Sequence, residues 1–307
     1  MTAAGALRDQ LGAEITFLIQ NTTLDPNYVR DFEFKAISFD ENLIAAIQTL
    51  ALNQQINVVV FDLFSRCLPE NMAEGLSALR ILGITLVGID SFVNQYNFLD
   101  LLFIPSFRNP LPTLTPSSSV LVYGWDCFLL NVPKAPKPWR PGNTILALTG
   151  GADATKLGKH WPSLLNEHLP SDAELAWVTG PFAQPAEFPQ TPRIKIVNHF
   201  SPPNLTLLMT QCQYAATVYG VSFFELLGHG IPTVVFSPYG TKDSEELDVV
   251  ASEGLALVAR DEYEATELLS QLTTDDALAK SLSERSLEKR LHAGPDRFVA
   301  EIAHLLG

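Results

Sequence analysis

Two glycine-containing turns, each placed directly after a short apolar run, constrain the fold of this chain more than any other feature. The first turn covers residues 149–153, TGGAD, and follows the apolar residues 144–148. The second is centred on Gly220 and follows the apolar residues 215–218. A short continuous apolar run is typical of a strand buried on both faces, as in a parallel sheet. Strand, turn and helix in that order predict an α/β fold with doubly wound sheets.

The first turn has the properties of an anion-binding loop. Gly150 and Gly151 let a phosphate approach the backbone closely, and we expect a helix to begin directly after them, capped by Asp153 or Thr155. The first N–H groups of a helix lack partners and carry partial positive charge. The segment therefore predicts a cradle for a phosphate group.

The second turn repeats this layout. Ser222 is expected to open a short helix that ends near Gly228 and Gly230, and Glu225 is expected in its first turn, where the helix dipole stabilises a carboxylate. Two adjacent hydroxyls can donate to the two oxygens of one carboxylate, which is how nucleotide-binding folds often hold a ribose. Glu225 is therefore the predicted ribose ligand.

The order Gly-Gly-Ala-Asp, then Gly-x-Ser-x-x-Glu-Leu, then Gly-Ile-Pro resembles the GT-B glycosyltransferases and related nucleotide-sugar enzymes. Within that group it is most similar to the UDP-sugar hydrolase of pseudaminic acid biosynthesis, of the spore-coat polysaccharide biosynthesis type. The resemblance implies two Rossmann-like domains with a cleft between them, and a UDP-sugar held by the second domain. It implies that backbone N–H groups around the two turns and the Ser222 hydroxyl hold the diphosphate. The implied nucleotide-sugar ligands are Gly150, Gly151, Asp153, Gly220, Ser222 and Glu225.

The chain departs from the family pattern at three places. Tyr219 stands where a second glycine is expected, and narrows the room for a phosphate unless its ring points away. Lys242 and Asp243 stand where relatives carry Asn-Gln to hold the sugar. The family also opens with a strand and a Gly-x-Gly-His-x-x-Arg turn, whose histidine is the expected catalytic residue of the hydrolases, and neither is present here.

The missing front end has a structural consequence. Residues 3–11 are typical of the end of a helix that stops at Gly12, so the first strand of the family has no counterpart. That strand lies in the middle of a doubly wound sheet, and its loss would expose the edges of two neighbours or leave a gap. A start assigned too late, a fragment and a degenerate member of the family all stay open as explanations.

Strand and helix patterns alternate along both halves of the chain. Strands are predicted at 15–19, 58–61, 85–89 and 120–123, then at 144–149, 174–179, 194–197, 215–218, 233–236 and 255–258. Helices are predicted near 41–53 and 70–82, and at 276–291 and 295–306. Four prolines between residues 129 and 142 break helix and sheet. We therefore predict a first domain at 1–132, a linker at 133–142 and a second domain at 143–307, whose last helix crosses back to the first domain as in other GT-B proteins.

Composition limits the class of partner. A net charge of −14 argues against a nucleic-acid partner, because binding a phosphate backbone depends on clustered Lys and Arg. Three widely spaced cysteines offer no metal or disulfide pattern and are typical of a reducing compartment. The longest apolar runs are too short to span a bilayer, and no leader pattern opens the sequence. We expect a soluble cytoplasmic protein with no cofactor and no metal.

Candidate catalytic residues are fewer and less specific. Asp62 and Asp90 follow predicted strands, where ligands bind in open α/β sheets, although an acid at such a position also caps turns. His199 follows another predicted strand and precedes two prolines, which makes it a candidate base facing the cleft. No Gly-x-Ser-x-Gly elbow, His-Glu-x-x-His or Gly-x-Gly-x-x-Gly motif occurs.

The predicted function is cleavage of the bond between sugar and diphosphate in a UDP-sugar, with the sugar passed to water or to a sugar acceptor near Asp62 and Asp90. The resemblance places this in surface polysaccharide or nonulosonate biosynthesis. An inactive relative that only binds the nucleotide sugar, and a UDP-sugar 2-epimerase, are the alternatives.

Overall fold

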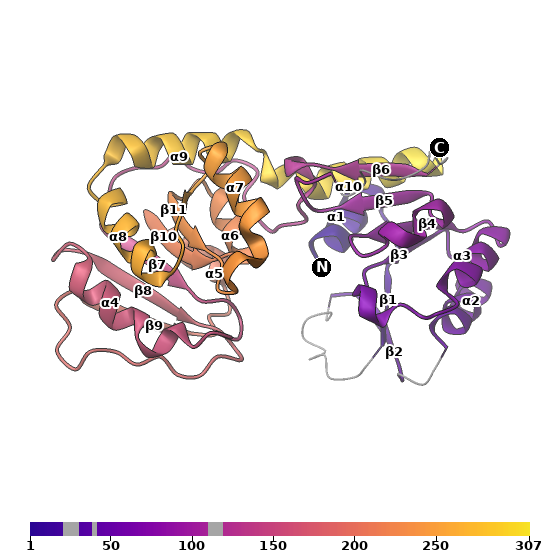
Figure 1. Cartoon of the computed structure of the whole chain (residues 1–307). Helices are drawn as coiled ribbons and strands as arrows, with labels where there is room; N and C mark the ends of the chain where they lie inside the picture. The colour runs from indigo at the N-terminus through magenta and orange to yellow at the C-terminus, as the bar shows by residue number, and fades with distance from the viewer. Residues whose placement is uncertain (21–30, 39–41, 110–118) are drawn as a thin grey trace. The chain divides into compact units, whose positions relative to one another are not determined.

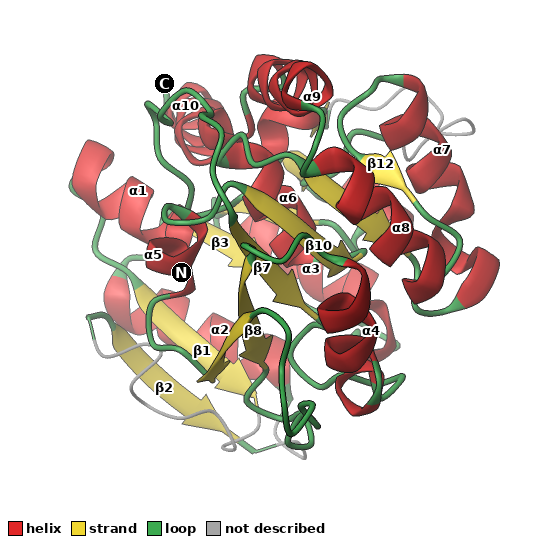
Figure 2. Cartoon of the chain, turned by 90° about the vertical axis from the view of Figure 1, so that its left-hand side faces the viewer, coloured by secondary structure: helices red, strands yellow, loops and turns green. Residues whose placement is uncertain are grey.

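The computed structural model describes residues 1–20, 31–38, 42–109 and 119–307 (Figure 1). The chain forms two compact units. Unit 1 consists of Met1–Leu129 together with Ala293–Gly307, and unit 2 of Leu130–His292. Each unit contains parallel β-sheet with helices packed against it, so the predicted α/β class is confirmed (Figure 2).

Unit 2 contains one parallel sheet with the strand order β12-β11-β10-β7-β8-β9. The strands are β7 (Thr144–Leu148), β8 (Glu174–Thr179), β9 (Lys195–Phe200), β10 (Tyr214–Val218), β11 (Thr233–Phe236) and β12 (Leu257–Val258). Counted from β7, this is the order 3-2-1-4-5-6 of dinucleotide-binding folds. The direction of winding reverses between β7 and β10, which are neighbours in the sheet.

Helices cover both faces of this sheet. They are α4 (Trp161–His168), α5 (Leu205–Met209), α6 (Val221–Gly228), α7 (Ser244–Ser252), α8 (Glu262–Leu272) and α9 (Asp276–Glu288). Ile145 and Ala147 of β7 pack into the core that includes α4 and α8. Leu146 and Leu148, which point to the opposite face, pack with residues of α5 and α6. The run 144–148 is continuously apolar because both of its faces are buried.

Unit 1 contains two separate parallel sheets, ordered β1-β2 and β3-β4-β5-β6 (Figure 1). The strands are β1 (Thr16–Gln20), β2 (Glu33–Ile37), β3 (Val58–Phe61), β4 (Thr85–Ile89), β5 (Leu101–Ile104) and β6 (Val120–Tyr123). Helices α2 (Leu43–Gln54) and α3 (Met72–Ile81) share one core. Helices α1 (Thr2–Leu11) and α10 (Gly294–Leu306) contact each other, and both pack against the β3–β6 sheet through a second core.

Several predicted elements need correction. Strands β2 and β5 were not predicted, and β2 carries a weak signal because all but one of its side chains are exposed. Strand β9 extends through Phe200, beyond the predicted end at 197. Helix α2 begins at Leu43, and residue 41, the predicted start, lies outside the described residues. The predicted helix end at Gly12 is confirmed, since Gly12 has φ of 66° and its N–H donates to the Arg8 carbonyl.

The proline-rich segment contains no helix or strand between residues 128 and 143, and only a few of its residues form bends. It packs on unit 2, where Trp139 donates its indole N–H to the Gln213 carbonyl at 2.8 Å and its ring lies edge-on to Tyr214. The chain passes from one unit to the other at residues 129–130 and again at 292–293. Helix α10 therefore belongs to the core of unit 1. No described helix combines the length and the apolar composition that a membrane span requires.

Candidate functional site

The carboxyl ends of β7 and β10 bring the two glycine turns side by side. Leu148 at the end of β7 pairs with Thr217 of β10, so the residues that follow the two strands are neighbours. A side chain at Gly150 would lie 3.8 Å from the Val218 side chain. In an open α/β sheet, ligands bind outside the carboxyl ends of the strands at the point where the winding reverses. The structure thus places Gly150, Gly151 and Gly220 at the expected binding position of unit 2.

The turn after β7 is a loop rather than a helix start, which corrects the expected helix. Gly150 has φ of 80°, a conformation that favours glycine. The carboxylate of Asp153 is buried and accepts hydrogen bonds from the N–H groups of Leu157 at 2.9 Å and Gly158 at 2.8 Å. It therefore caps the 3-10 turn η5 (Leu157–Lys159), and α4 begins only at Trp161. Backbone N–H groups of the loop, and not the Asp153 carboxylate, remain for a ligand.

The loop after β8 holds the first glycine turn in place. A side chain at Gly180 would lie 2.4 Å from the Gly151 carbonyl oxygen and 2.5 Å from that of Gly150. Phe182 donates its N–H to the Gly151 carbonyl at 2.9 Å. By contrast, a side chain at Gly151 would meet nothing within 4 Å. Gly180 is thus needed for close packing, a role that its position after a strand and before Pro181 did not reveal in the sequence.

The turn after β10 opens directly into α6, as predicted. Gly220 is the N-cap residue, and no side chain caps the helix. Space around Gly220 is open, since a side chain there would meet nothing within 4 Å. Tyr219, which stands where the resemblance implies a glycine, packs its ring against Phe223 and Phe224 of α6, with centroid distances of 5.9 and 5.5 Å. Ser222, in the first turn, is half-buried.

Glu225 is the fifth residue of α6, directly after the first turn and not inside it as predicted. Because the helix begins at Val221, its first turn contains no acidic residue, and the expected stabilisation by the first turn of the helix does not apply. Glu225 is half-buried, and no described residue donates a hydrogen bond to its carboxylate. Burial raises the pKa of Glu225 above its usual value. A desolvated carboxylate without a partner is typical of a ligand-binding position.

In unit 1, the structure brings Asp62 and Asp90 together at the carboxyl ends of the neighbouring strands β3 and β4. The pKa of Asp90 is raised, first by burial and then by the negative charge of Asp62. Asp90 also adopts φ of 54°, a left-handed conformation that is uncommon for a residue other than glycine. Backbone strain at a non-glycine residue occurs preferentially at functional sites.

His199 lies inside β9, which corrects its expected place in the loop after the strand. β9 is the edge strand, separated from β7 by β8. At about 4.8 Å between strands, His199 is two strand spacings from the switch point. The two residues after His199 were not predicted as site residues. Phe200 is 61% exposed, and Ser201 has φ of 41°. An exposed aromatic ring at the carboxyl edge can stack on a base or a sugar.

Lys242 and Asp243, which replace the family Asn-Gln pair, form contacts with neighbouring residues after β11. The Asp243 carboxylate accepts a hydrogen bond of 2.6 Å from the Ser237 hydroxyl. The Lys242 ammonium lies 5.0 Å from the centre of the Tyr239 ring, a cation–π distance. Asp243 thus helps to fix the loop that follows β11.

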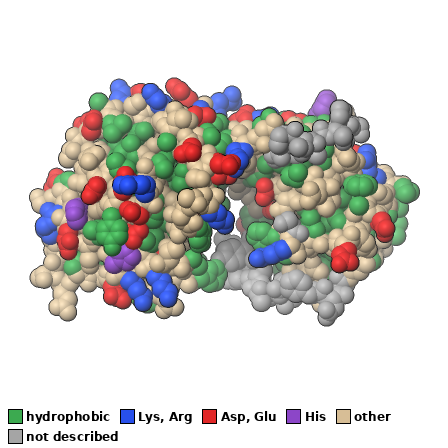
Figure 3. Space-filling model, viewed as in Figure 1, with side chains coloured by type: hydrophobic (Ala, Val, Ile, Leu, Met, Phe, Trp, Pro, Cys, Tyr) green, Lys and Arg blue, Asp and Glu red, His purple; other side chains and the backbone are tan. Residues whose placement is uncertain are grey.

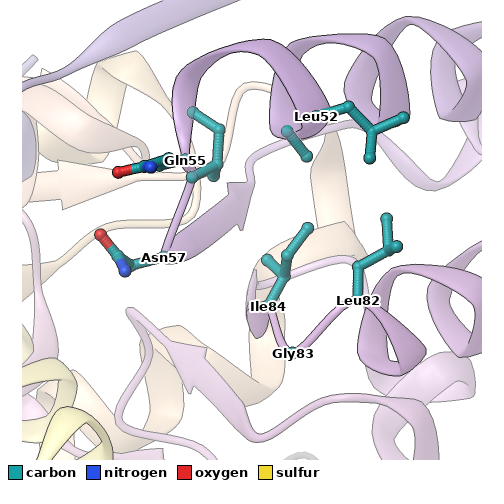
Figure 4. A pocket seen from close by; sticks show the side chains of 8 residues that line it. Leu52, Gln55, Asn57, Leu82, Gly83 and Ile84 are labelled. Carbon is teal, nitrogen blue, oxygen red and sulfur yellow. The ribbon is translucent and has the colours of Figure 1, made fainter.

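A cavity of about 380 Å³ lies at the opposite ends of the unit 1 strands (Figure 4). It is lined by residues before β3 and β4, including Leu52, Gln55, Asn57 and Leu82. In Figure 4 the amides of Gln55 and Asn57 point to one side, while Leu52 and Leu82 face the other. Because this is the amino edge of the strands, the cavity is not where an α/β sheet binds its ligand. Within the described ranges, no cluster of His, Cys, Asp or Glu is suited to a metal ion.

Charge on the visible surface is mixed. On the face in Figure 3, Lys and Arg side chains are interspersed with Asp and Glu, and no extended basic patch is seen on either unit there. A net charge of −14 agrees with this picture.

Solved structures with the same architecture are glycosyltransferases. MurG of Acinetobacter baumannii matches 98% of this chain and 95% of its own, with 17% identity and a TM-score of 0.65. UGT2 of Phytolacca americana, in complex with UDP-2-fluoro-glucose and pterostilbene, matches 98% of this chain and 94% of its own at 13% identity, with the same TM-score. HepE of Anabaena, in complex with UDP, matches 96% and 99% at 12% identity, with a TM-score of 0.57.

The fold is GT-B. The sequence prediction of this fold is confirmed, because the match with these structures extends over nearly the whole chain. No protein-family model matches the sequence. The comparison with curated proteins also gives no match. At identities below 20% the likeness establishes architecture, and the activity must be argued from the residues of this chain.

Proposed function

We propose that this protein binds a UDP-sugar at the switch point of unit 2 and cleaves the bond between the sugar and the diphosphate. The observation that carries the proposal is the pairing of β7 with β10, which sets two open glycine turns beside each other. The half-buried, unpartnered Glu225 lies on the helix that follows the second turn. This combination supplies a place for a diphosphate and an acceptor for sugar hydroxyls.

The diphosphate would be held mainly by backbone. The loop after Gly150 and the N–H groups at the start of α6 can donate hydrogen bonds to phosphate oxygens, and the helix dipole favours negative charge there. The Ser222 hydroxyl can donate another. Negative charge builds on the diphosphate as the glycosidic bond breaks, so donors fixed in advance by the fold stabilise the transition state more than the ground state.

Glu225 would select the nucleotide through its ribose. The carboxylate can accept hydrogen bonds from the 2′- and 3′-hydroxyls together. HepE is in complex with UDP, whereas the spinosyn rhamnosyltransferase SpnG, another structural neighbour, is in complex with thymidine diphosphate. A deoxyribose offers only one of the two hydroxyls, so a carboxylate at this position favours UDP over thymidine diphosphate.

The acceptor would be activated in unit 1. Asp90, with its raised pKa and its neighbour Asp62, is suited to take a proton from a hydroxyl near neutral pH. The acceptor is a sugar hydroxyl in a transferase or water in a hydrolase. We expect the transferase or hydrolase reaction to serve surface polysaccharide or nonulosonate biosynthesis.

Calorimetric titration with UDP tests the nucleotide site. We expect micromolar binding to the wild type, weaker binding of thymidine diphosphate, and UDP binding about 10- to 100-fold weaker in Glu225→Gln, because the amide is uncharged and one of the two acceptor oxygens becomes a donor group. Glu284→Gln, an exposed change on α9, is the matched control and should bind like the wild type. A folded wild type that binds neither nucleotide would rule out the site.

Product analysis then separates the activities. After incubation with UDP-sugars, with and without sugar acceptors, a transferred sugar identifies a glycosyltransferase, and free sugar plus UDP identifies a hydrolase. An epimerised UDP-sugar would identify a 2-epimerase. Unchanged ligand, despite binding, would identify an inactive relative.

A further inference from the structure

The exposed side chains at the carboxyl edge of the unit 2 sheet are of two kinds. On the side of β8 and β9, Phe182 is 81% exposed and Phe200 is 61% exposed. On the side of β11, the loop after the strand presents Tyr239, which is 54% exposed, and the exposed Lys242. The two glycine turns lie between these sides, because the strand order is β11-β10-β7-β8-β9 (Figure 1). A ligand at the turns therefore has an aromatic flank on one side and a flank that also carries a cation on the other.

The two flanks lie at different distances from the glycine turns. Strands are spaced by about 4.8 Å, so the end of β9 is about 10 Å from β7, whereas β11 is the direct neighbour of β10. The Tyr219 N–H donates to the Phe236 carbonyl at 2.9 Å, so the loop after β11 begins beside the second glycine turn.

This spacing orients a UDP-sugar along the edge of the sheet. The ribose separates the base from the diphosphate, whereas the sugar is joined to the diphosphate directly. Aromatic side chains stack on nucleobases. The base therefore fits the more distant flank, which holds Phe200, and the sugar fits the loop after β11.

Lys242 is presented by a loop whose shape is fixed. The buried Ser237 hydroxyl donates to the Asp243 carboxylate at 2.6 Å and accepts a hydrogen bond from the Tyr239 N–H at 3.2 Å. The Lys242 ammonium lies 5.0 Å from the centre of the Tyr239 ring. In the part of the chain that the structure describes, this ammonium forms no salt bridge, although Asp243 is the next residue. The loop thus holds out an aromatic face with a cation beside it.

These two side chains suit a sugar that carries negative charge. An aromatic ring offers an apolar face to the C–H groups of a sugar ring. An ammonium is a compact charge with three donors and no acceptor, whereas a side-chain amide offers both donors and an acceptor to neutral hydroxyls. A hydrogen bond between two charged groups is about twice as strong as one between neutral groups. Lys242 consequently gains more from a carboxylate on the sugar than from a hydroxyl.

We propose that Lys242 selects a UDP-sugar whose sugar ring carries a carboxylate, as in the uronic acids. Tyr239 packs against the sugar ring, and the Lys242 ammonium pairs with the carboxylate. This role rests on the proposed function, because the sugar belongs to the UDP-sugar that the glycine turns would hold. The backbone groups at the turns and Glu225 bind the diphosphate and the ribose, which are the same in every UDP-sugar, so the choice of sugar falls to other residues.

Calorimetric titration with UDP, UDP-glucose and UDP-glucuronic acid tests the selection. The two UDP-sugars differ only in one exocyclic group, which is a hydroxymethyl in the first and a carboxylate in the second. We expect the wild type to bind UDP-glucuronic acid at least about tenfold more tightly than UDP-glucose. Lys242→Gln should bind the two about equally and should keep the wild-type affinity for UDP within about twofold. Added salt should reduce the preference of the wild type, because salt screens an exposed ion pair.

Two further variants complete the test. Lys280→Gln removes an exposed lysine of α9, and it should keep both the wild-type affinities and the wild-type preference. Tyr239→Ala should weaken the binding of both UDP-sugars by about 2- to 10-fold and leave UDP itself unaffected, because only the packing against the sugar ring is lost.

Three results would overturn the selection by Lys242. The first is a wild type that binds UDP but does not prefer UDP-glucuronic acid. The second is a preference that persists in Lys242→Gln. The third is a loss of UDP affinity in Lys242→Gln as large as the loss for UDP-glucuronic acid, which would place the lysine at the diphosphate. All three leave the nucleotide site intact, whereas a wild type that binds no UDP would remove the site and the selection together.

Discussion

At the scale of single residues, Glu225 is half-buried and receives no hydrogen bond from the residues that the structure describes. Its pKa is raised from the usual 4.5 by desolvation, so the folded protein holds the Glu225 proton more tightly than the unfolded chain does. The stability that this residue contributes is present below the unfolded pKa and is lost as the pH rises through the folded pKa. At neutral pH the buried charge of Glu225 therefore destabilises the folded protein, a cost that binding residues often carry.

Glu225→Gln should therefore be more stable than the wild type at neutral pH, by about 0.5–2 kcal/mol. The difference should shrink as the pH falls through the folded pKa, and it should vanish well below 4.5, where the wild-type carboxyl is protonated in both states. Urea denaturation across this pH range measures it, with Glu284→Gln as the control. A wild type that is the more stable of the two at neutral pH would contradict the prediction.

His229 shows the opposite titration. It is the C-cap residue of α6, it is 8% exposed, and its Nε2 atom has no partner among the described residues. Burial lowers the pKa of His229 below 6.5. The imidazole is therefore neutral in the folded state, and the unfolded chain takes up the proton first as the pH falls.

The wild type should lose stability from about pH 7 to about pH 5.5, at up to about 1.4 kcal/mol per pH unit for this one proton. His229→Leu cannot titrate, and its free energy of unfolding should depend less on pH over the same interval. His168→Gln, a change at an exposed histidine, should keep the wild-type dependence. Parallel pH profiles for the wild type and His229→Leu would refute this assignment.

At the scale of elements, the glycine turns depend on the loops that pack behind them. The sequence predicted β7, β10 and the turns after them because fully buried strands leave a continuous apolar pattern. The role of Gly180 was not predictable, since it arises from contact between the loops after β7 and β8. The same holds for Asp153, whose bonds to Leu157 and Gly158 move the helix start away from the turn.

Gly180→Ala should destabilise the protein by about 1–3 kcal/mol, because the new methyl group would overlap the carbonyl oxygens of Gly150 and Gly151. Gly151→Ala is the matched change in open space and should keep stability within about 0.5 kcal/mol. If this space takes a phosphate, Gly151→Ala should still weaken UDP binding. Thermal unfolding and calorimetry measure the two effects, and equal stability of both variants would contradict the packing argument.

At the scale of the whole molecule, the chain returns to its first unit at the end. Phe298 of α10 is fully buried and lies edge-on to Phe103 of β5 at a centroid distance of 5.0 Å. The last helix therefore packs into unit 1, although unit 2 separates this helix from the rest of unit 1 in the sequence. The core that contains α10 can be completed only after the rest of the chain is made.

Phe298→Ala should cost about 3–5 kcal/mol of stability in unit 1, because it leaves a cavity in the core shared with α1. UDP binding by unit 2 should be retained at temperatures where unit 1 has begun to unfold. Leu306→Ala, at an exposed site on the same helix, is the control and should stay within about 0.5 kcal/mol. Amide exchange, followed separately for the residues of each unit, measures the loss of stability in Phe298→Ala. A loss of protection concentrated in unit 2 would contradict the prediction.

The sequence by itself determined the α/β class, the buried strands of unit 2 and the two glycine turns. Hydrophobic periodicity and glycine placement are local signals, and each is readable within about ten residues. Only the tertiary structure decided the strand order that makes β7 and β10 neighbours, and the raised pKa values of Glu225 and Asp90. These depend on contacts between residues far apart in the chain, which no local pattern encodes.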